Sequence, residues 1–149
     1  MKLFASITLA VSLLAGAASA QNVISGSGCS GFSIGFSGAP QIGSSYTLSC
    51  SGGPASGPLA LFIGLPDPTG TDITFIGATS CSIYINLSFL ATIPGLSTDG
   101  SGAFSTTVSI ANNPGDVGVV IGQQFAAISI GANPLGVVTT DLLTTTIQS

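Results

Sequence analysis

The sequence predicts an all-β fold: a single antiparallel β-sandwich of about eight strands, Ig-like or jelly-roll-like, over residues 21–149. Gly, Pro, Ser and Asn interrupt the chain about every ten residues, as turns do between short strands. The runs between these interruptions are rich in β-branched and aromatic residues, and several alternate apolar with polar side chains. No stretch after Ala20 has the apolar period of an amphipathic helix.

The expected strands are residues 32–36, 45–51, 58–64, 72–77, 81–90, 102–111, 119–131 and 136–147. Because successive side chains of a strand point to opposite faces, the alternation predicts which of them face the core. Tyr46, Leu48 and Cys50 share one expected inner face. In the run that begins at Cys81, the alternation places the apolar side chains inward and Tyr84 outward.

Residues 1–20, MKLFASITLAVSLLAGAASA, have the pattern of a secretory signal peptide. Lys2 supplies the positive start, an apolar run follows, and Ala18-Ser19-Ala20 forms a small-residue cleavage site. The apolar run is too short to cross a bilayer as a helix. We therefore expect two regions, a signal peptide over 1–20 and the β-sandwich domain over 21–149. The mature protein is expected to be secreted or at the cell surface, with no integral membrane segment.

Charged side chains are scarce, and after residue 20 all of them are acidic: Asp67, Asp72, Asp99, Asp116 and Asp141. Nucleic acids and acidic membranes require a basic surface, so neither is an expected partner. An uncharged, hydroxyl-rich surface gives little repulsion between molecules, which makes self-association an open alternative to a monomer kept in solution by hydroxyls and amides. The expected partner is an unidentified protein or surface, with a second copy of the chain among the candidates.

Three cysteines, Cys29, Cys50 and Cys81, in an exported chain predict one disulfide and one remaining thiol. Cys50 and Cys81 are both at inward positions of their expected strands, so a buried bond between them is one alternative. Cys29 lies in the flexible segment GSGCSG and could attach that segment to the body of the domain. There is no His and no CxxC pair, which argues against a zinc site, and no cofactor is expected.

Several short motifs follow one another in a fixed order: GSGCSG, GAPQIGSSYTLSCSGGPASGPLALFIG, TSCSIYINLS and NNPGDVGVVIGQQFAAISIGANPLGVVTTDLLTTTI. With this order the chain resembles, over nearly all of 26–147, a family of exported β-sandwich domains common in planctomycetes and related bacteria. The resemblance implies a disulfide between Cys29 and Cys81, with Cys50–Cys81 as the second choice, and no enzymatic activity. The chain departs from the family pattern at Cys50, which is extra, and at Ser80, where Gly is usual.

Catalytic chemistry has few candidate residues. A nucleophilic Ser or Cys needs a base, and residues 21–149 contain no His, Lys or Glu. A pair of Asp carboxylates would have to face each other across a cleft. Asp99, in TDGSG, is better explained as part of an Asp-Gly hairpin turn. We therefore expect no catalytic residues and no enzyme.

Calcium is the one metal for which the sequence offers candidate loops. Asp67 and Asp72 lie in PDPTGTD, and Asn112, Asn113 and Asp116 lie in NNPGD. Calcium takes six to eight oxygen ligands, and neither loop has the spacing of an EF-hand. Capping of turns by Asp and Asn is the preferred interpretation, so no metal ligand is assigned.

Polar rows offer weaker signals. Thr144-Thr145-Thr146 suggests ice or carbohydrate binding, but no regular repeat accompanies it and exposed aromatics are few, so a solvated strand face is the preferred interpretation. Asn86-Leu87-Ser88 is an N-glycosylation sequon, which we do not expect to be used in a bacterial host. Gln123 and Gln124 are expected to have a structural role, because a buried Gln would form hydrogen bonds with backbone groups. The sequence thus predicts a non-enzymatic structural or interaction module at the cell surface or in the extracellular matrix. The alternative is a calcium-dependent carbohydrate- or protein-binding module.

Overall fold

The computed structural model describes residues 21–149, and the predicted signal peptide lies outside the described residues. The described chain is all-β: it has strands and three single-turn 3-10 helices, and every pair of named strands is antiparallel. Within residues 21–149, no helix has the length and apolar character needed to cross a membrane.

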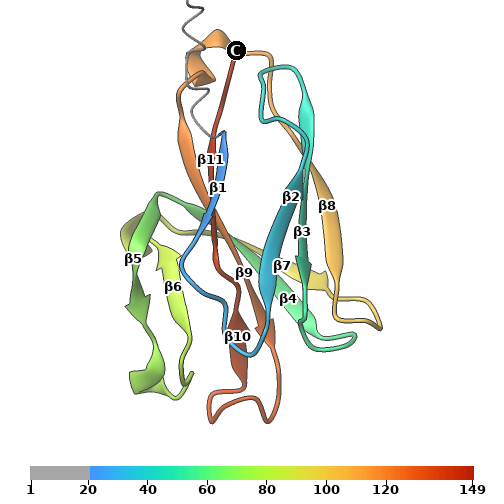
Figure 1. Cartoon of the computed structure of the whole chain (residues 1–149), viewed down its shortest axis with the longest axis vertical. Helices are drawn as coiled ribbons and strands as arrows, with labels where there is room; N and C mark the ends of the chain where they lie inside the picture. Colours follow the sequence, from blue (N-terminus) through green and yellow to red (C-terminus); the bar gives the residue numbers. More distant parts are fainter. Residues whose placement is uncertain (1–20) are drawn as a thin grey trace, which may run out of the picture.

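Figure 1 shows the strands in three sheets. The strands are β1 (Asn22–Ser25), β2 (Ser33–Ser37), β3 (Ser45–Ser51), β4 (Pro58–Gly64), β5 (Pro66–Asp72), β6 (Ser82–Ile85), β7 (Ala91–Ser97), β8 (Phe104–Ser109), β9 (Val120–Ile128), β10 (Val137–Thr139) and β11 (Leu142–Thr146). The 3-10 helices are η1 (Thr74–Ile76), η2 (Leu87–Phe89) and η3 (Pro114–Asp116).

The largest sheet has the order β1-β11-β9-β4-β7, and β10 also pairs with β9. β10 and β11 therefore run along the same neighbour, with Thr139 opposite Ala126 and Leu143 opposite Gln123. Thr140 lies between the two strands and still contacts β9, because its backbone N–H donates to Phe125 O and its Oγ1 accepts from Phe125 N. The sheet thus remains hydrogen-bonded where its last strand is interrupted.

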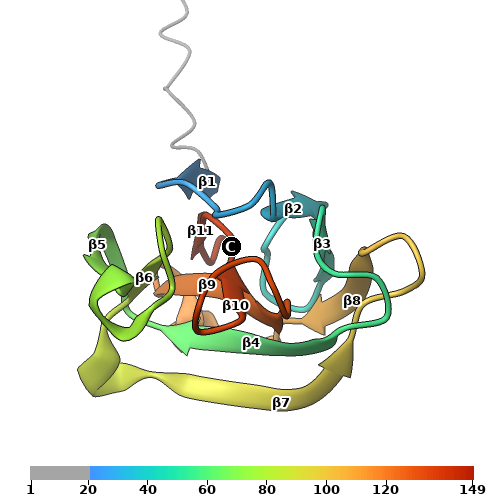
Figure 2. The ribbon, with the colours of Figure 1, turned by 90° about the horizontal axis from the view of Figure 1, so that it is seen from below.

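A three-stranded sheet, β2-β3-β8, lies over one face of the large sheet (Figure 2). The main hydrophobic core fills the space between them, and Leu48, Phe125 and Leu143 are fully buried there. The predicted inner face of β3 is confirmed, since Tyr46, Leu48 and Cys50 are all buried.

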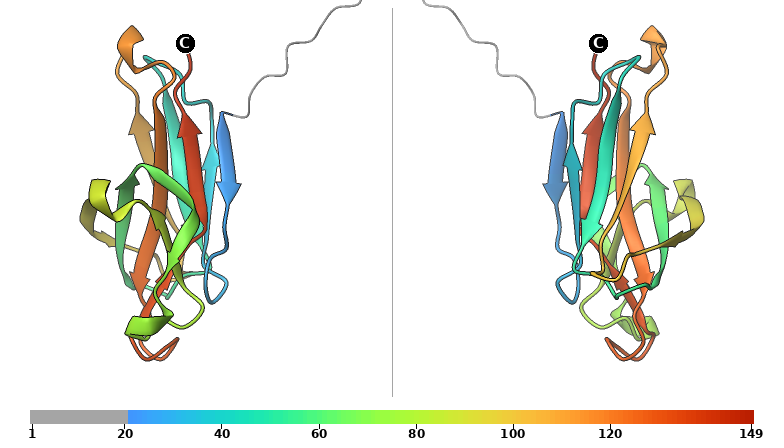
Figure 3. Two further views of the ribbon diagram at one scale, coloured as in Figure 1. Left: turned by 90° about the vertical axis from the view of Figure 1, so that its left-hand side faces the viewer. Right: turned by 90° about the vertical axis from the view of Figure 1, so that its right-hand side faces the viewer.

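The hairpin of β5 and β6 covers part of the opposite face of the large sheet (Figure 3). A smaller core forms beneath it from Tyr84, Ile85 and Leu142, against which Phe62 and Leu90 pack. The large sheet therefore buries side chains on both of its faces.

The predicted strand over 72–77 is wrong. Only Asp72 is in a strand, and the chain then turns through η1, because Gly77 adopts a φ of 99° that ends the turn. The predicted strand over 81–90 is interrupted in the same way. Asn86 caps η2 by accepting a hydrogen bond from Ser88 N, so β6 ends at Ile85.

Tyr84 was predicted to face outward, and it is buried instead, with 7 % of its surface exposed. Its ring packs against Gly26 and Gly70, where any added Cβ would lie within 2.6 Å of ring carbons. Its hydroxyl accepts a hydrogen bond from Ser27 N at 3.0 Å. The alternation failed here because the segment before β2 covers the side of β6 that was expected to face solvent.

Candidate interaction surface

The two candidate calcium loops contain carboxylates that accept hydrogen bonds within their own turns. Asp67 Oδ1 accepts hydrogen bonds from Thr69 N at 3.2 Å and from Thr69 Oγ1 at 2.5 Å, and Asp72 Oδ1 accepts one from Thr74 N at 2.8 Å. Hydrogen bonds to the charged form lower the pKa of both carboxyls, and the largest cause is the Thr69 side chain for Asp67 and the Thr74 side chain for Asp72. The geometry is that of Asx turns, as the preferred interpretation of the sequence had it.

The NNPGD loop is organised in the same manner. Asn113 Oδ1 accepts from Gly115 N at 3.1 Å, and its Nδ2 donates to Asp116 Oδ1 at 3.0 Å, while Asn112 is exposed. Across residues 21–149, no three Asp, Glu, His or Cys side chains gather where they could hold a metal ion.

The other two carboxylates also serve the backbone. Asp99 Oδ1 accepts from the backbone N–H groups of Ser101 and Ala103, at 2.8 and 3.0 Å, and from Ser101 Oγ. The Ser101 hydroxyl is the largest cause of the lowered pKa of Asp99. Asp141 Oδ1 accepts from Ile34 N of β2 at 2.7 Å. Each of the five Asp side chains therefore orders a turn or a strand edge.

Melting temperature should accordingly depend on pH only at the acidic end of the ordinary range. The pKa values of Asp67, Asp72 and Asp99 are lower in the folded chain than the unfolded value, so their contribution is complete above that value and is lost as pH falls through the folded pKa. Residues 21–149 have no His, Lys or Glu. We expect a constant melting temperature from about pH 5 to 8 and a decline below about pH 4, measured by circular dichroism. A steady change between pH 5 and 8 would contradict this.

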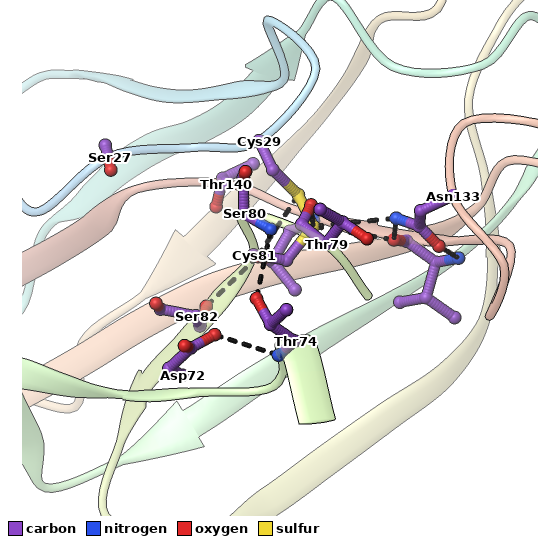
Figure 4. The surroundings of a disulfide bond; sticks show 12 residues. Ser27, Cys29, Asp72, Thr74, Thr79, Ser80, Cys81, Ser82, Asn133 and Thr140 are labelled. Carbon is purple, nitrogen blue, oxygen red and sulfur yellow. Dashed lines mark hydrogen bonds between the residues drawn. A yellow bond between two sulfur atoms is a disulfide. The ribbon is translucent and has the colours of Figure 1, made fainter. Parts of the chain in front are cut away.

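The disulfide joins Cys29 to Cys81, with a Cα–Cα distance of 5.1 Å, as the resemblance implied (Figure 4). Cys29 precedes β2 and Cys81 precedes β6, and both lie against β10. Thr139 N donates to Cys29 Sγ at 3.1 Å, and Cys29 N donates to Thr139 O at 2.9 Å. Ser80, where the family pattern has Gly, adopts a φ of 62°, the left-handed region that Gly reaches at lower cost.

Cys50 is the free cysteine, and it is buried in β3. Burial raises the pKa of its thiol to about 11, because the charged thiolate is poorly solvated there. It therefore behaves as a small apolar side chain of the core, and the alternative bond to Cys81 is not formed.

Two buried glutamines connect the layers. Gln123 Nε2 donates to the hydroxyl of Tyr46 at 2.6 Å, which links β9 to β3. Gln124, on the opposite face of β9, accepts from Tyr84 N at 2.9 Å and donates to the carbonyls of Ser82 and Thr140, at 2.9 and 2.7 Å. These bonds agree with the structural role that the sequence analysis gives to Gln123 and Gln124.

An apolar groove of about 360 Å³ remains on the outer face of the large sheet, beside the β5–β6 hairpin. Side chains of β4, β7, β9 and β10 line it, and all of the lining residues are apolar or Gly. The lining residues include Pro58, Ala60, Phe62, Pro94, Ile128 and Val137. None of them is charged, so the groove offers contact with another apolar surface.

A second apolar feature, the tip, lies where η1 meets the β9–β10 hairpin. Leu135 N donates to Gly77 O at 3.1 Å, which fixes the two turns side by side. Phe75 is 81 % exposed and Ile130 is 95 % exposed, and Ile76 and Leu135 are also exposed. Ile128 of the groove is at the start of the same hairpin loop. The tip is therefore a group of four large apolar side chains in solvent.

Sequence reasoning did not find either feature. The sequence predicts a strand over Phe75 and Ile76 and places Ile130 near the end of another, and neither prediction indicates that these side chains are exposed. The groove depends on β7, whose sequence ATIPGLS was not predicted as a strand. The available signal was a large apolar residue flanked by turn residues, as in Ser129-Ile130-Gly131.

Comparison of the chain with protein-family models, with curated protein sequences and with solved structures found no match.

Proposed function

We propose that the chain is an exported, non-enzymatic interaction module that contacts another macromolecule through the tip and the groove, at the cell surface or in the extracellular matrix. The exposure of Phe75 and Ile130 carries this proposal. Large apolar side chains grouped in solvent have a cost that soluble proteins usually avoid unless a partner covers them. The partner is a protein surface with apolar character, because the groove presents neither charge nor exposed hydroxyls to a sugar.

Export is supported by the signal-peptide pattern of residues 1–20 and by a disulfide, which persists in oxidising compartments. We also propose that the two facing sheets form a β-sandwich of the Ig-like or jelly-roll-like kind, from the exported family that the sequence resembles. The Cys29–Cys81 bond and the left-handed Ser80 support this assignment.

The absence of enzymatic activity belongs to the same proposal. It is supported by the use of each Asp carboxylate in a local hydrogen bond and by the lack of His in the chain. The calcium-dependent alternative has less support, since the oxygens of Asp67 and Asp72 accept bonds from Thr69 and Thr74.

The proposal is tested by replacing Phe75 and Ile130 together with Ser and measuring how much of the exported chain stays on washed producing cells. We expect the wild-type chain to be retained and the double variant to be released into the medium. Both side chains are exposed, so their loss removes little packing from the fold.

A matched control replaces Ile24 and Phe36 with Ser, because these apolar residues are also exposed but lie on β1 and β2. The control should be retained like the wild type. Equal retention of the tip variant, equal loss of the control, or a wild-type chain found wholly in the medium would each contradict the proposal.

A further inference from the structure

The outer edge of the three-stranded sheet is formed by β8, which pairs with β3 alone. Ile110 N donates to Ser44 O, and in an antiparallel ladder every second residue then turns its backbone groups toward the partner strand. The backbone N–H and C=O groups of Phe104, Thr106 and Val108 consequently face β3. The backbone N–H and C=O groups of Ser105, Thr107 and Ser109 face away from the sheet.

The other outer strands carry features that block a further strand. β7 contains Pro94, which has no N–H, and β5 contains Pro66 and Pro68. On β2, the outward N–H of Ile34 donates to the Asp141 carboxylate. β1 has only four residues. Proline, charge and short length are the usual protections of sheet edges, and β8, FSTTVS, has none of them.

We propose that β8 of a second copy of this chain pairs antiparallel with β8, about a two-fold axis at Thr107. In this register Thr107 exchanges hydrogen bonds with Thr107 of the second copy, and Ser105 exchanges them with Ser109. The two three-stranded sheets become one continuous sheet. This inference is independent of the tip and groove, which lie on other strands.

The side chains fit this register. Thr106 lies opposite Val108 of the second copy, and Phe104 lies opposite Ile110, on the face that points to the core. These four side chains are half-buried in the single chain, and Val108 and Ile110 help to line a cavity of about 220 Å³. Pairing therefore gives them additional cover, and β-branched and aromatic cross-strand pairs stabilise antiparallel strands.

The solvent side of the edge offers no obstacle, because its side chains are those of Ser105, Thr107 and Ser109, which are small, uncharged and exposed. The outer face of β3 continues the same chemistry with Ser45, Thr47 and Ser49, which lie opposite Ser109, Thr107 and Ser105. The Cβ atoms of directly opposed residues are about 5 Å apart, so charges introduced at position 107 should decide whether the strands pair. Like charges in the two copies should prevent pairing, and opposite charges should favour it.

The test is sedimentation velocity of the mature, oxidised chain over a wide concentration range. We expect the wild type to dimerise as concentration rises. Thr107→Lys and Thr107→Glu should each remain monomeric, and an equal mixture of the two should dimerise again. Thr107→Val keeps the N–H and adds no charge, so it should dimerise like the wild type. Thr107→Pro, which removes the N–H at the axis, should weaken the dimer at least about tenfold.

Hydrogen exchange of the wild type gives a readout that does not depend on any variant. The amides of Ser105, Thr107 and Ser109 should exchange more slowly as the concentration rises. A wild-type chain that is monomeric throughout, or a dimer in which these amides stay unprotected, would overturn the inference. A dimer that is unaffected by both charged variants would do so as well. None of these outcomes bears on the retention of the chain on cells, which tests the tip.

Discussion

Replacing Cys29 and Cys81 together with Ser should lower the free energy of unfolding by about 4 kcal/mol. The bond spans 52 residues of sequence, and on the chain-entropy model a crosslink over a loop of this length removes that much conformational freedom from the unfolded state. Domains of this size are stable by only about 5–15 kcal/mol, so a substantial part of the stability depends on this bond.

The position of the bond explains why local structure should suffer along with the unfolded-state effect. It connects the segment before β2 to the segment before β6, and Cys29 also hydrogen-bonds Thr139 of β10. Without the bond, the three-stranded sheet and the β5–β6 hairpin remain attached to the large sheet only by packing and hydrogen bonds. Local opening of the β5–β6 hairpin should therefore become easier, with faster amide exchange at Ile73 and Cys81.

The measurement is equilibrium unfolding in guanidinium chloride with and without reductant. Reductant should shift the wild-type transition to lower denaturant and leave the double variant unchanged. Cys50→Ala serves as the control, because it removes a buried thiol that is outside the bond and should keep the response to reductant. If the double variant unfolds at the same denaturant concentration as the oxidised wild type, the bond contributes little and the expectation is wrong.

The alternation of apolar and polar residues predicted β3 and the burial of its inner side chains because β3 has one face on the core and one in solvent. The same rule failed for β6, since both faces of this strand are covered and the Tyr84 ring packs against Gly26, in the segment before β2, and Gly70, in the partner strand β5. Alternation indicates one covered face. It carries no information on a second layer built from residues far away in the sequence.

Two of the missed strands, β5 and β7, have a different cause. PDPTGTD and ATIPGLS are polar or interrupted by Pro and Gly, and neither sequence has a preference for extended structure. Both lie at outer positions of their sheets, where only one side of the strand forms a ladder and Pro is tolerated. Their pairing is imposed by β4 and β6, so a reading of the local sequence could not find them, nor the groove that β7 borders.

The alternation of apolar and polar residues could not decide whether Cys29 or Cys50 is the partner of Cys81. Cys50 and Cys81 both occupy inward positions, and both are buried. Cys50, however, lies in the three-stranded sheet opposite Phe104, while Cys81 lies before β6 and near Val137 of β10. Facing the interior does not bring two residues together: Cys29, Cys50 and Cys81 all lie in the main core, and the choice between partners depends on the order of the strands.

Replacing Gln124 with Met should destabilise the domain by roughly 2 to 6 kcal/mol, although Met has nearly the same length and the site is fully buried. The amide of Gln124 takes the place of ladder hydrogen bonds between β6 and β9. Without it, Tyr84 N and Thr140 O have no partner, and each buried unpaired group costs roughly 1–3 kcal/mol. Ser82 O is less affected, since it also accepts from Thr139 Oγ1.

Gln123 provides a matched control, because it is the neighbouring residue, of the same type and equally buried, on the other face of β9. Its partners are hydroxyls: Tyr46 can rotate its O–H, and Thr145 Oγ1 keeps its bond to Asn22 Oδ1 at 2.7 Å. Gln123→Met should therefore cost less than Gln124→Met in guanidinium unfolding, and only Gln124→Met should speed amide exchange at Tyr84. Equal costs would show that packing at these positions, and not the hydrogen bonds to the backbone, determines the stability. In that case the β5–β6 hairpin is held by the Cys29–Cys81 bond and the small core of Ile85 and Leu142, and Gln124 only fills space.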